Sequence, residues 1–571
     1  MKRFVVRASL FLLIASTGFG PATGQDEDAD TLNILYWQAV SILNPYLAGG
    51  TKDLEAASLV LEPLAYINPD GILVPVLATA IPALDNGGIA EDLTSITWRL
   101  RENVYFSDGK PLTPDDVVFS WRYCTNPGAG CSGLRWFEDV VLVEAVDEYA
   151  VRIRFSKPKP YPYAPFVGEG SVVLHSGQFA DCLGSGAPTC TAQNFGPLGT
   201  GPYVVDEFRA NDVVTFTANP LYRESGKPHF SRVVIKGGGD AESSARAVLE
   251  TGEADYAWNL QVAHQVLDAM AQAGHGRIEV GFATHIERLL LNQTNPSPDL
   301  PPETRSIDPV NNPHPFLTNA AVRKALSMAI DRHVLAGQLY GEAGLPTCNL
   351  INAPPHNVSP NNDACLAQDI AGANALLDEA GILDSDGDGV RELDGAPLRI
   401  HYRTSTNALR QDTQSLIKQW WGQIGVETGL DNVSGAVFFG ADPASPDTYY
   451  KFYADVQMWT TSTGSPDAEA FLAGWLCGDN PAPNNNWLGR NVTRHCDPAF
   501  DELFGQLRRA GDPAQRALVT IQLNDLLVAG GVVIPLIYRA SVSGVSNRLE
   551  GVWVNAWDTE LWNIEDWTRK S

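Results

Sequence analysis

Short strand patterns alternate with capped helix patterns along almost the whole 571-residue chain, and this alternation restricts the fold more than any other feature. In residues 31–37, Leu32, Ile34 and Tyr36 alternate with the residues between them, which is the period of a strand. Residues 113–124 open with Thr113 as a capping residue and Pro114 at the first helical position, the usual start of a helix. Mixed strands and helices in this order predict an α/β fold.

Further segments carry the same two kinds of pattern. Residues 95–109 predict a hairpin that closes at 107–109, and residues 318–335 predict a single helix. Helices are also expected at 371–381 and 512–530, and strands at 397–403 and 531–541. In the stretch GTGPY, Gly199 and Gly201 are expected to form a structural turn that uses backbone angles other residues resist.

The N-terminus has the pattern of a secretory signal peptide, assigned to residues 1–24. Lys2, Arg3 and Arg7 precede an apolar run at 8–20 that is too short to cross a bilayer, and small residues follow it. No cysteine follows the expected cleavage region, so a lipid anchor is not expected. These features predict an exported, soluble protein that resides in the periplasm.

The chain is strongly acidic. Its formal charge is −27, and it becomes −30 once residues 1–24, which hold three basic and no acidic residues, are removed. A surface of this sign repels phosphates, which argues against nucleic acid as a partner.

Eight cysteines fall as four neighbouring pairs in the sequence. An even number in an exported chain predicts disulfides, although about 105 connectivities are open for eight cysteines. Local pairing is preferred because each pair closes a short loop rich in Gly, Pro or Asn, and a zinc site is less favoured because no C-x-x-C motif occurs. The expected bonds are Cys124–Cys131, Cys182–Cys190, Cys348–Cys365 and Cys477–Cys496.

An acidic loop at 381–395 resembles a calcium loop at its start. The loop lies between a predicted helix and a predicted strand, and its twelfth position is Gly395, where a calcium sensor needs a bidentate Glu. A calcium-driven switch is therefore not expected. Two alternatives stay open, a metal-free turn and a structural Ca²⁺ site formed by Asp384, Asp386, Asp388, the Val390 carbonyl and Glu392.

Five stretches, taken in order, resemble the extracellular solute-binding protein family 5. They are residues 104–123, 197–208 with 218–224, 321–335, 376–402 and 534–552. That family holds dipeptide-, oligopeptide- and nickel-binding proteins of ABC importers. Its dipeptide-binding members bracket an N-V-x-R-x-C run with a cysteine pair, which supports the Cys477–Cys496 bond. The D-G-D-G stretch is also frequent in the family, which favours a scaffold role for the acidic loop.

The resemblance implies a periplasmic binding protein of the second type, with two α/β lobes joined by crossing strands and an inserted third domain. Lobe one is assigned to 31–65, 199–282 and 525–571, the inserted domain to 66–198, and lobe two to 283–524. The implied function is that of the periplasmic substrate-binding component of an ABC importer. Such a protein is a monomer and no enzyme, requires no cofactor, and delivers a small solute to a membrane permease.

The resemblance also points to the ligand site. Residues 458–475 match a family segment in which a Trp is followed three residues later by an Asp that pairs with a peptide's α-ammonium group. Trp459 matches that Trp, whereas Ser462 stands at the Asp position. Either another acid such as Asp467 takes over, or the ligand lacks a free amine. Peptides are the family default, and an oligosaccharide or another amine-free solute is the alternative.

Aromatic and polar residues near the expected cleft are the candidate ligand contacts, because sugars and peptides both use such mixtures. The alternative for each Trp is ordinary core packing. The candidates are Trp37, Gln38, Trp258, Asn259, Trp459, Ser462, Asp467 and Trp475.

Two other classes of function are weaker. A secreted hydrolase could use an acid pair such as Asp467 and Glu469, but acidic residues are abundant and no spacing singles out a catalytic pair. The chain carries no G-x-S-x-G, H-E-x-x-H or Walker motif. A calcium-dependent adhesion protein is disfavoured by the single incomplete loop.

Overall fold

The structure is a computed structural model that describes residues 30–440 and 444–570. The predicted signal peptide at 1–24 lies outside the described residues. Among the described residues, none of the helices combines the length and the apolar character that a membrane crossing requires.

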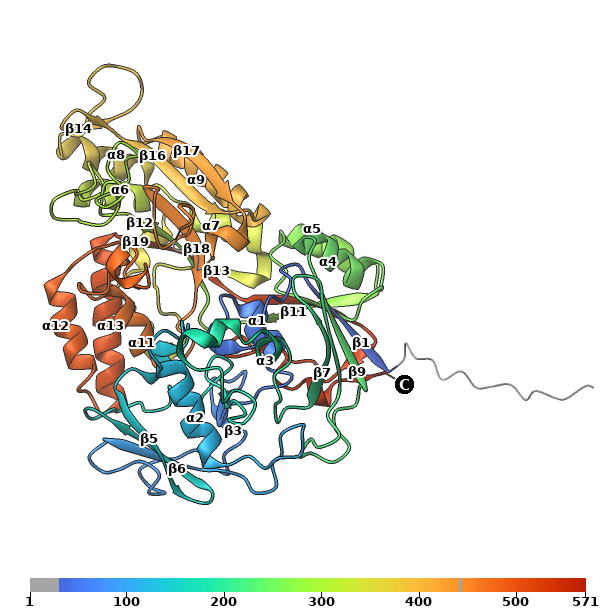
Figure 1. Ribbon diagram of the computed structural model, residues 1–571. Helices are drawn as coiled ribbons and strands as arrows, with labels where there is room; N and C mark the ends of the chain where they lie inside the picture. Colours follow the sequence, from blue (N-terminus) through green and yellow to red (C-terminus); the bar gives the residue numbers. More distant parts are fainter. Residues whose placement is uncertain (1–29, 441–443, 571) are drawn as a thin grey trace, which may run out of the picture.

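A seven-stranded mixed sheet forms the core of the part of the molecule drawn at the right of Figure 1. Three of its strands, β1, β9 and β10, run parallel, and β1 lies between the other two. In spatial order the strands are β11 (Gly276–Gly281), β20 (Ser541–Ser546), β10 (Tyr256–Trp258), β1 (Thr31–Tyr36), β9 (Arg232–Gly237), β8 (Val213–Ala218) and β7 (Tyr203–Arg209).

A six-stranded sheet forms a second core, at the top of Figure 1. In this sheet β16 runs parallel to both β17 and β18. In spatial order the strands are β13 (Gly344–Pro346), β19 (Val533–Arg539), β12 (Ile286–Leu291), β18 (Val456–Thr461), β16 (Arg399–Ser405) and β17 (Glu427–Val433).

Two chain crossings join the sheets. The chain leaves β11 of the first sheet at Gly281 and enters β12 of the second at Ile286, and it returns from β19 to β20 through Ala540 alone. The crossings lie side by side, because the Arg539 N–H donates to the His285 carbonyl at 2.9 Å. This arrangement places β19 in the second sheet, although the sequence assignment ended lobe two at 524.

Residues 65–202 form an additional unit below the first sheet (Figure 1). Its three-stranded sheet has the order β4 (Ser95–Arg99), β6 (Ala150–Phe155) and β5 (Val140–Asp147). The predicted hairpin at 95–109 is confirmed at its closing turn, where Tyr105 and Pro111 form an antiparallel bridge around 107–109. It is wrong for residues 95–99, because β4 pairs with β6 instead. Two-stranded antiparallel sheets elsewhere are β2 (Ala65–Ile67) with β3 (Leu73–Pro75), β14 (Glu392–Leu393) with β15 (Ala396–Pro397), and β21 (Leu549–Glu550) with β22 (Thr568–Arg569).

Helices cover the sheets. Those of the first sheet and the additional unit are α1 (Thr51–Ala57), α2 (Pro114–Thr125), α3 (Thr191–Phe195), α4 (Ala241–Ala245) and α5 (His264–Ala271). Those that follow along the chain are α6 (Ala320–Met328), α7 (Arg332–Leu335), α8 (Ile370–Glu379), α9 (Ala408–Gly422), α10 (Gly435–Phe438), α11 (Glu469–Leu472), α12 (Pro498–Leu507) and α13 (Pro513–Gly530).

Local sequence signals account for the helix ends. Thr113 and Asp116 bond across the start of α2, where the Thr113 N–H donates to the Asp116 carboxylate at 2.9 Å. The predicted single helix at 318–335 is instead two helices, because Asp331 leaves the helical conformation and its side chain caps α7 through the Val334 N–H.

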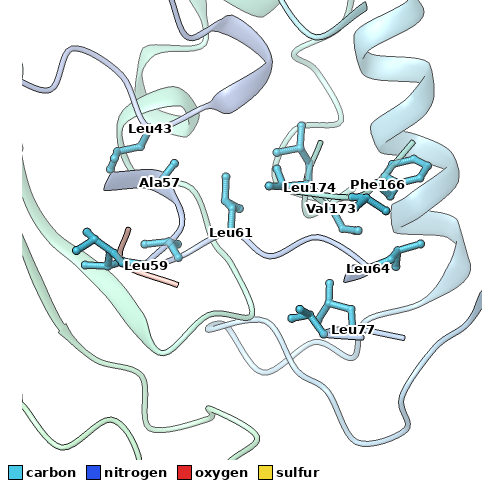
Figure 2. Packing of buried hydrophobic residues seen from close by; sticks show 14 of the residues in the cluster. Leu43, Ala57, Leu59, Leu61, Leu64, Leu77, Phe166, Val173 and Leu174 are labelled. Carbon is cyan, nitrogen blue, oxygen red and sulfur yellow. The ribbon is translucent and has the colours of Figure 1, made fainter. Parts of the chain in front are cut away.

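The additional unit shares one hydrophobic core with the first sheet. Figure 2 shows Leu61 and Leu64, from the segment that leaves α1, close to Phe166, Val173 and Leu174 of the additional unit. All five side chains are buried. Because one apolar core spans both parts, we treat them as one packed body that faces the second sheet.

The four predicted disulfides are confirmed. They are Cys124–Cys131, Cys182–Cys190, Cys348–Cys365 and Cys477–Cys496. Each closes a short local loop, which is why neighbouring cysteines in the sequence could be paired correctly.

Candidate ligand-binding site

The carboxyl ends of parallel strands from the two sheets face each other across the crossings. In the first sheet β1 ends before Trp37 and β10 before Asn259, and in the second sheet β16 ends at Ser405. Asn407 donates from its side-chain amide to the Gln261 side-chain oxygen at 2.6 Å, which links the two edges directly. Ligands of open α/β sheets bind beyond the carboxyl ends of the strands, so this edge is the candidate site.

Gln38 approaches the second sheet from the first. A Cβ atom placed on Gly435, at the start of α10, would lie 3.4 Å from the Gln38 side-chain nitrogen. Gln38 keeps part of its surface accessible. Its amide is therefore available at the line where the two lobes meet.

Trp37 and Asn259 form one unit at the end of the first sheet. The Trp37 indole N–H donates to the Asn259 carbonyl at 2.9 Å, and the Asn259 side-chain oxygen accepts a bond from Arg539 at 3.0 Å. Asn259 has a positive φ of 54°, a conformation that Asn tolerates better than most residues. The half-buried Trp37 ring is thus held in place beside the crossing strand.

Three of the four predicted tryptophans, Trp258, Trp475 and Trp459, belong to the cores. Trp258 is 3% exposed and its ring lies 4.9 Å from that of Tyr36, within the core of the first lobe. Trp475 is buried in the apolar cluster of the second lobe. Core packing, the alternative weighed for every tryptophan, describes the surroundings of these two and of Trp459.

Trp459 lies on β18 with its ring against Phe438 and Tyr449. The guanidinium of Arg288 lies 5.0 Å above the ring, and Arg288 also donates to the Trp459 carbonyl at 3.3 Å. Burial lowers the pKa of Arg288 to about 9. Trp459 therefore supports a buried cation, and only a small part of its surface is accessible.

Ser462 and Asp467 already have partners within the protein. The Ser462 hydroxyl lies 2.5 Å from the hydroxyl of Thr284, in the first crossing. Both oxygens of Asp467 accept bonds from Arg516 at 2.8 Å. Because this guanidinium neutralises its charge, Asp467 does not offer a free acid to a ligand amine.

Sequence reasoning missed the contribution of the additional unit. Arg135 lies 4.4 Å above the ring of the neighbouring Trp136, and a Cβ atom on Gly464 of the second lobe would lie 3.9 Å from that ring. Arg135 keeps accessible surface, yet burial among surrounding protein atoms lowers its pKa, with Tyr449 and Tyr450 nearby. Both properties suit a side chain that lines an internal space. The R-W pair after Gly133 was the available sequence signal.

A cavity of about 490 Å³ also lies between the lobes, beside α5. Its walls are mainly apolar and come from both lobes, among them Leu260, Val280 and Leu339. Gln261 and Arg539 also line it, so it reaches the crossing strands. Its remaining walls come from α5, the segment after α7, Ile278, Val542 and Leu409. Neither Trp37 nor Trp136 lines it, and we therefore place the ligand beside those two rings.

The acidic loop forms a compact group of oxygen ligands between α8 and β14. One carboxylate oxygen each from Asp384, Asp386, Asp388 and Glu392 lies within 4.8 Å of the others. The Asp384 carboxylate also accepts the N–H groups of Gly387 and Gly389, which folds the loop around it. Hard oxygen ligands at this spacing fit Ca²⁺.

Comparisons with known proteins agree with this architecture. Residues 73–482 match the model of the bacterial extracellular solute-binding proteins, family 5 Middle. Protein XP55 of Streptomyces lividans is 28% identical over 514 residues, 89% of this chain and 83% of that protein. The glutathione-binding protein GsiB of Shigella flexneri is 23% identical over 522 residues, 90% of each chain.

A solved structure shows the same fold. The oligopeptide-binding protein AppA of Bacillus subtilis, in complex with a nonapeptide, superposes with a TM-score of 0.75 at 20% identity. The match covers 95% of this chain and 99% of that one. The predicted fold, a type II periplasmic binding protein, is therefore confirmed. Since the family model matches most of the chain, the protein belongs to the bacterial extracellular solute-binding proteins of family 5 and is a solute-binding protein.

Proposed function

We propose that the protein is the substrate-binding component of an ABC importer and captures a peptide between its two lobes. The observation that carries the proposal is the meeting of two sets of parallel strand ends, joined directly by Gln261 and Asn407 at 2.6 Å. A solute at this edge contacts both lobes at once. It stabilises the closed state because it makes more contacts there than in the open state. Relatives named for glutathione and oligopeptide binding make a peptide the preferred ligand.

The proposal includes the cellular setting. Export by a cleaved signal peptide at 1–24 would place the protein in the periplasm, free of a lipid anchor. There it would act as a monomer and deliver its solute to a membrane permease. The family consists of binding proteins, and the acid pair Asp467 and Glu469 fits a structural role better than hydrolysis, because both carboxylates bind Arg516.

An oligosaccharide is the second candidate. Ser462 and Thr284 supply hydroxyls at the crossing, and Trp37 supplies a half-buried ring, which together suit a neutral sugar. This alternative predicts binding without any dependence on a ligand amine.

Thermal unfolding with a ligand panel separates these candidates. The panel contains Met-Leu, the tetrapeptide STSA, glutathione, cellobiose and maltotriose. A true ligand at 100 times its dissociation constant should add about 2.7 kcal/mol to the free energy of unfolding. We expect a peptide to stabilise the protein and to reduce its radius of gyration in solution scattering. The peptide should be recovered unchanged afterwards. Stabilisation by the sugars alone would transfer the proposal to the second candidate.

A variant pair tests the position of the site. Trp37→Ala should weaken binding of the stabilising solute at least tenfold, because it removes a ring fixed at the strand ends. Trp553→Ala serves as the control, since this ring is 67% exposed in the C-terminal segment. Equal affinities for the two variants would contradict the placement.

We also propose that the acidic loop holds a structural Ca²⁺ through Asp384, Asp386, Asp388 and Glu392, with the Val390 carbonyl as a fifth ligand. The grouping of four carboxylate oxygens within 4.8 Å supports this. Adding Ca²⁺ to protein treated with a chelator should raise the unfolding temperature, and Asp384→Asn should abolish the rise. Mg²⁺ should act more weakly because it demands a tighter geometry. An unchanged unfolding temperature with millimolar Ca²⁺ would favour the metal-free turn.

A further inference from the structure

Four carboxylates from three separate segments come together in the first lobe. Glu55 lies on α1, Glu169 follows the additional unit's β6, and Asp558 and Glu560 lie in the C-terminal segment. The Glu560 N–H donates to both Glu55 oxygens at 3.0 and 2.9 Å, and the Glu169 N–H donates to Asp558 at 2.9 Å. These bonds tie the segments into one cluster, which we call the acidic floor.

No basic side chain neutralises the acidic floor. Among the described residues, none of its four carboxylates lies within 4.0 Å of a Lys, Arg or His nitrogen. Arg539 acts on Glu560 only from a distance, and its own ion-pair contact is with Glu287 at 3.8 Å. Proteins normally pair buried charges, because unpaired ones are costly. The floor is therefore a group of buried acids without a basic partner among the described residues.

Two polar atoms in the floor have no partner. The Tyr36 hydroxyl is fully buried and neither accepts nor donates a hydrogen bond. Burial raises the pKa of Tyr36, and the charges of the nearby Glu55, Glu560 and Glu169 raise it further. One oxygen of Glu169 is equally inaccessible and equally without a partner. Buried polar groups are nearly always satisfied in folded proteins. These two atoms thus mark a place that a hydrogen-bond donor fits.

The floor lies next to the ligand edge. Tyr36 directly precedes Trp37, and Glu560 bonds to Ser543 on β20, just after the second crossing. Next to Glu169, a Cβ atom on Gly170 would lie 3.0 Å from the indole nitrogen of Trp136, whose ring also approaches Gly464 of the second lobe. Glu169 itself keeps partly accessible surface. Glu169 is therefore the part of the floor that a ligand at the strand ends can contact, since Tyr36, Glu55 and Glu560 are buried.

The spacing distinguishes the kind of cation. Among the described residues, only the loop at 384–392 brings three or more acidic or histidine ligand atoms within 4.8 Å of one another. The acidic floor does not, so it lacks the compact shell that a metal ion requires. An organic ammonium group, in contrast, needs only one or two acceptors from the protein, because each of its N–H groups forms a separate directed bond.

We propose that the acidic floor, formed by Glu55, Glu169, Asp558, Glu560 and the Tyr36 hydroxyl, receives the ammonium group of the ligand. The inference rests on the proposed function, since it places the charged end of the captured solute in the first lobe. It explains how an amine can be recognised although Ser462 stands at the family's Asp position and Asp467 is paired with Arg516. Recognition in the floor depends on neither residue.

The protonation of the floor gives the proposal a specific signature. Burial, followed by the charge of Glu560, raises the pKa of Glu55 to about 8, and burial also raises the pKa values of Glu169, Asp558 and Glu560. An arriving cation favours the ionised carboxylates, so binding releases protons. Affinity for an amine should therefore rise as the pH rises from 5 toward 8, about tenfold per unit for each proton released.

The first experiment uses n-butylammonium chloride as probe and n-butanol as its neutral control. At pH 7.5 the ammonium salt should raise the unfolding temperature of the wild-type protein and n-butanol should not. Glu169→Gln should remove the rise, while the unliganded variant unfolds at or above the wild-type temperature, because that side chain has no partner to lose. Glu565→Gln is the matched control, since Glu565 is another carboxylate whose pKa burial raises, outside the floor. No rise in the wild-type protein, or the same rise in Glu169→Gln, would overturn the proposal.

The second experiment separates this inference from the proposed function. Met-Leu, STSA and glutathione are each compared with their N-acetylated forms by titration calorimetry in two buffers of different ionisation enthalpy. At least a tenfold preference for the free amine, with proton release that Glu169→Gln reduces, supports the floor. Peptides that bind equally well with a blocked amine would refute the floor and keep the peptide function. A response to butylammonium without any peptide binding would keep the floor and refute the peptide function.

Discussion

At the scale of single residues, the protein treats two buried groups of acids in opposite ways. Glu287, on β12, is buried but lies 3.0 Å from Arg410 and 3.8 Å from Arg539. Burial opposes its charge, yet the two arginines hold its pKa below the usual value. The carboxylates of the acidic floor have no such partners, and their pKa values rise instead. The difference separates a structural ion pair from a proposed binding group.

Arg410→Met tests the structural pair. It leaves Glu287 with only the more distant Arg539, so we expect the free energy of unfolding to fall by about 3 kcal/mol, measured by urea denaturation. The folded pKa of Glu287 is depressed, so the stability it contributes is present above its unfolded pKa of about 4.3 and is lost as the pH falls through the folded value. Arg99→Met is the control, because its pair with Asp147 is exposed. Equal losses in both variants would contradict the assignment.

At the scale of elements, close approach between segments matters as much as local preference. Gly199 and Gly201 were expected to serve unusual backbone angles, but neither is among the glycines with positive φ. A Cβ atom on Gly199 would instead lie 1.8 Å from the Val60 carbonyl oxygen, and one on Gly201 would lie 2.6 Å from that of Leu59. The expected reason is therefore wrong, and the glycines allow the chain entering β7 to pass against the segment after α1.

Gly199→Ala should destabilise the protein strongly, because the contact is with backbone rather than with a movable side chain. We expect a loss of at least about 2 kcal/mol in chemical denaturation. Gly226→Ala is the control for a glycine that needs its backbone angle alone, since it has positive φ and no atom near the added carbon. A smaller loss for Gly199→Ala than for Gly226→Ala would contradict the close-approach argument.

The disulfides act on the same scale. Cys477–Cys496 closes a loop of 19 residues and Cys124–Cys131 one of 7. Because a longer loop restricts the unfolded chain more, replacing both cysteines by alanine should cost about 3 kcal/mol for the first bond and about 2 kcal/mol for the second. Denaturation of the two variants under non-reducing conditions measures the difference. A larger loss for the shorter loop would show that native contacts outweigh chain entropy.

At the scale of the whole molecule, polar bridges join the lobes away from the crossings. Lys159 of the additional unit lies 3.0 Å from Glu469 on α11, and Arg508 at the end of α12 lies 2.8 Å from Glu138. Figure 1 shows α12 and α13 reaching down toward β5 of the additional unit. These contacts exist only while the lobes are together, so they bias the molecule toward the closed state.

Lys159→Met should shift that balance without touching the ligand. We expect a two- to tenfold loss of affinity for the stabilising solute, mostly through faster dissociation, because the closed state loses a bridge. Stopped-flow release and solution scattering measure the two effects. Lys110→Met is the control, since Lys110 pairs with Asp108 within the additional unit. An unchanged dissociation rate would show that this bridge does not contribute to closure.

Much of the architecture could be predicted because its signals are local. Capping residues and apolar periodicity located α2, α8, α13, β1 and β16, and the short spacing of the cysteines indicated all four disulfides. The order of family-like stretches then indicated two lobes and an additional unit. Local interactions determine these features, so they can be predicted from the sequence.

The site depended on contacts between distant segments, which only the tertiary structure decided. Burial separated Trp37 at the strand ends from Trp258 and Trp475 in the cores, and Arg516 neutralised Asp467 from 49 positions away. Glu55 and Glu560 are 505 positions apart, so no local pattern could bring them together. The sequence alone determined most of the elements, the disulfides and the family. Folding decided which charges are paired, because pairing depends on proximity in space.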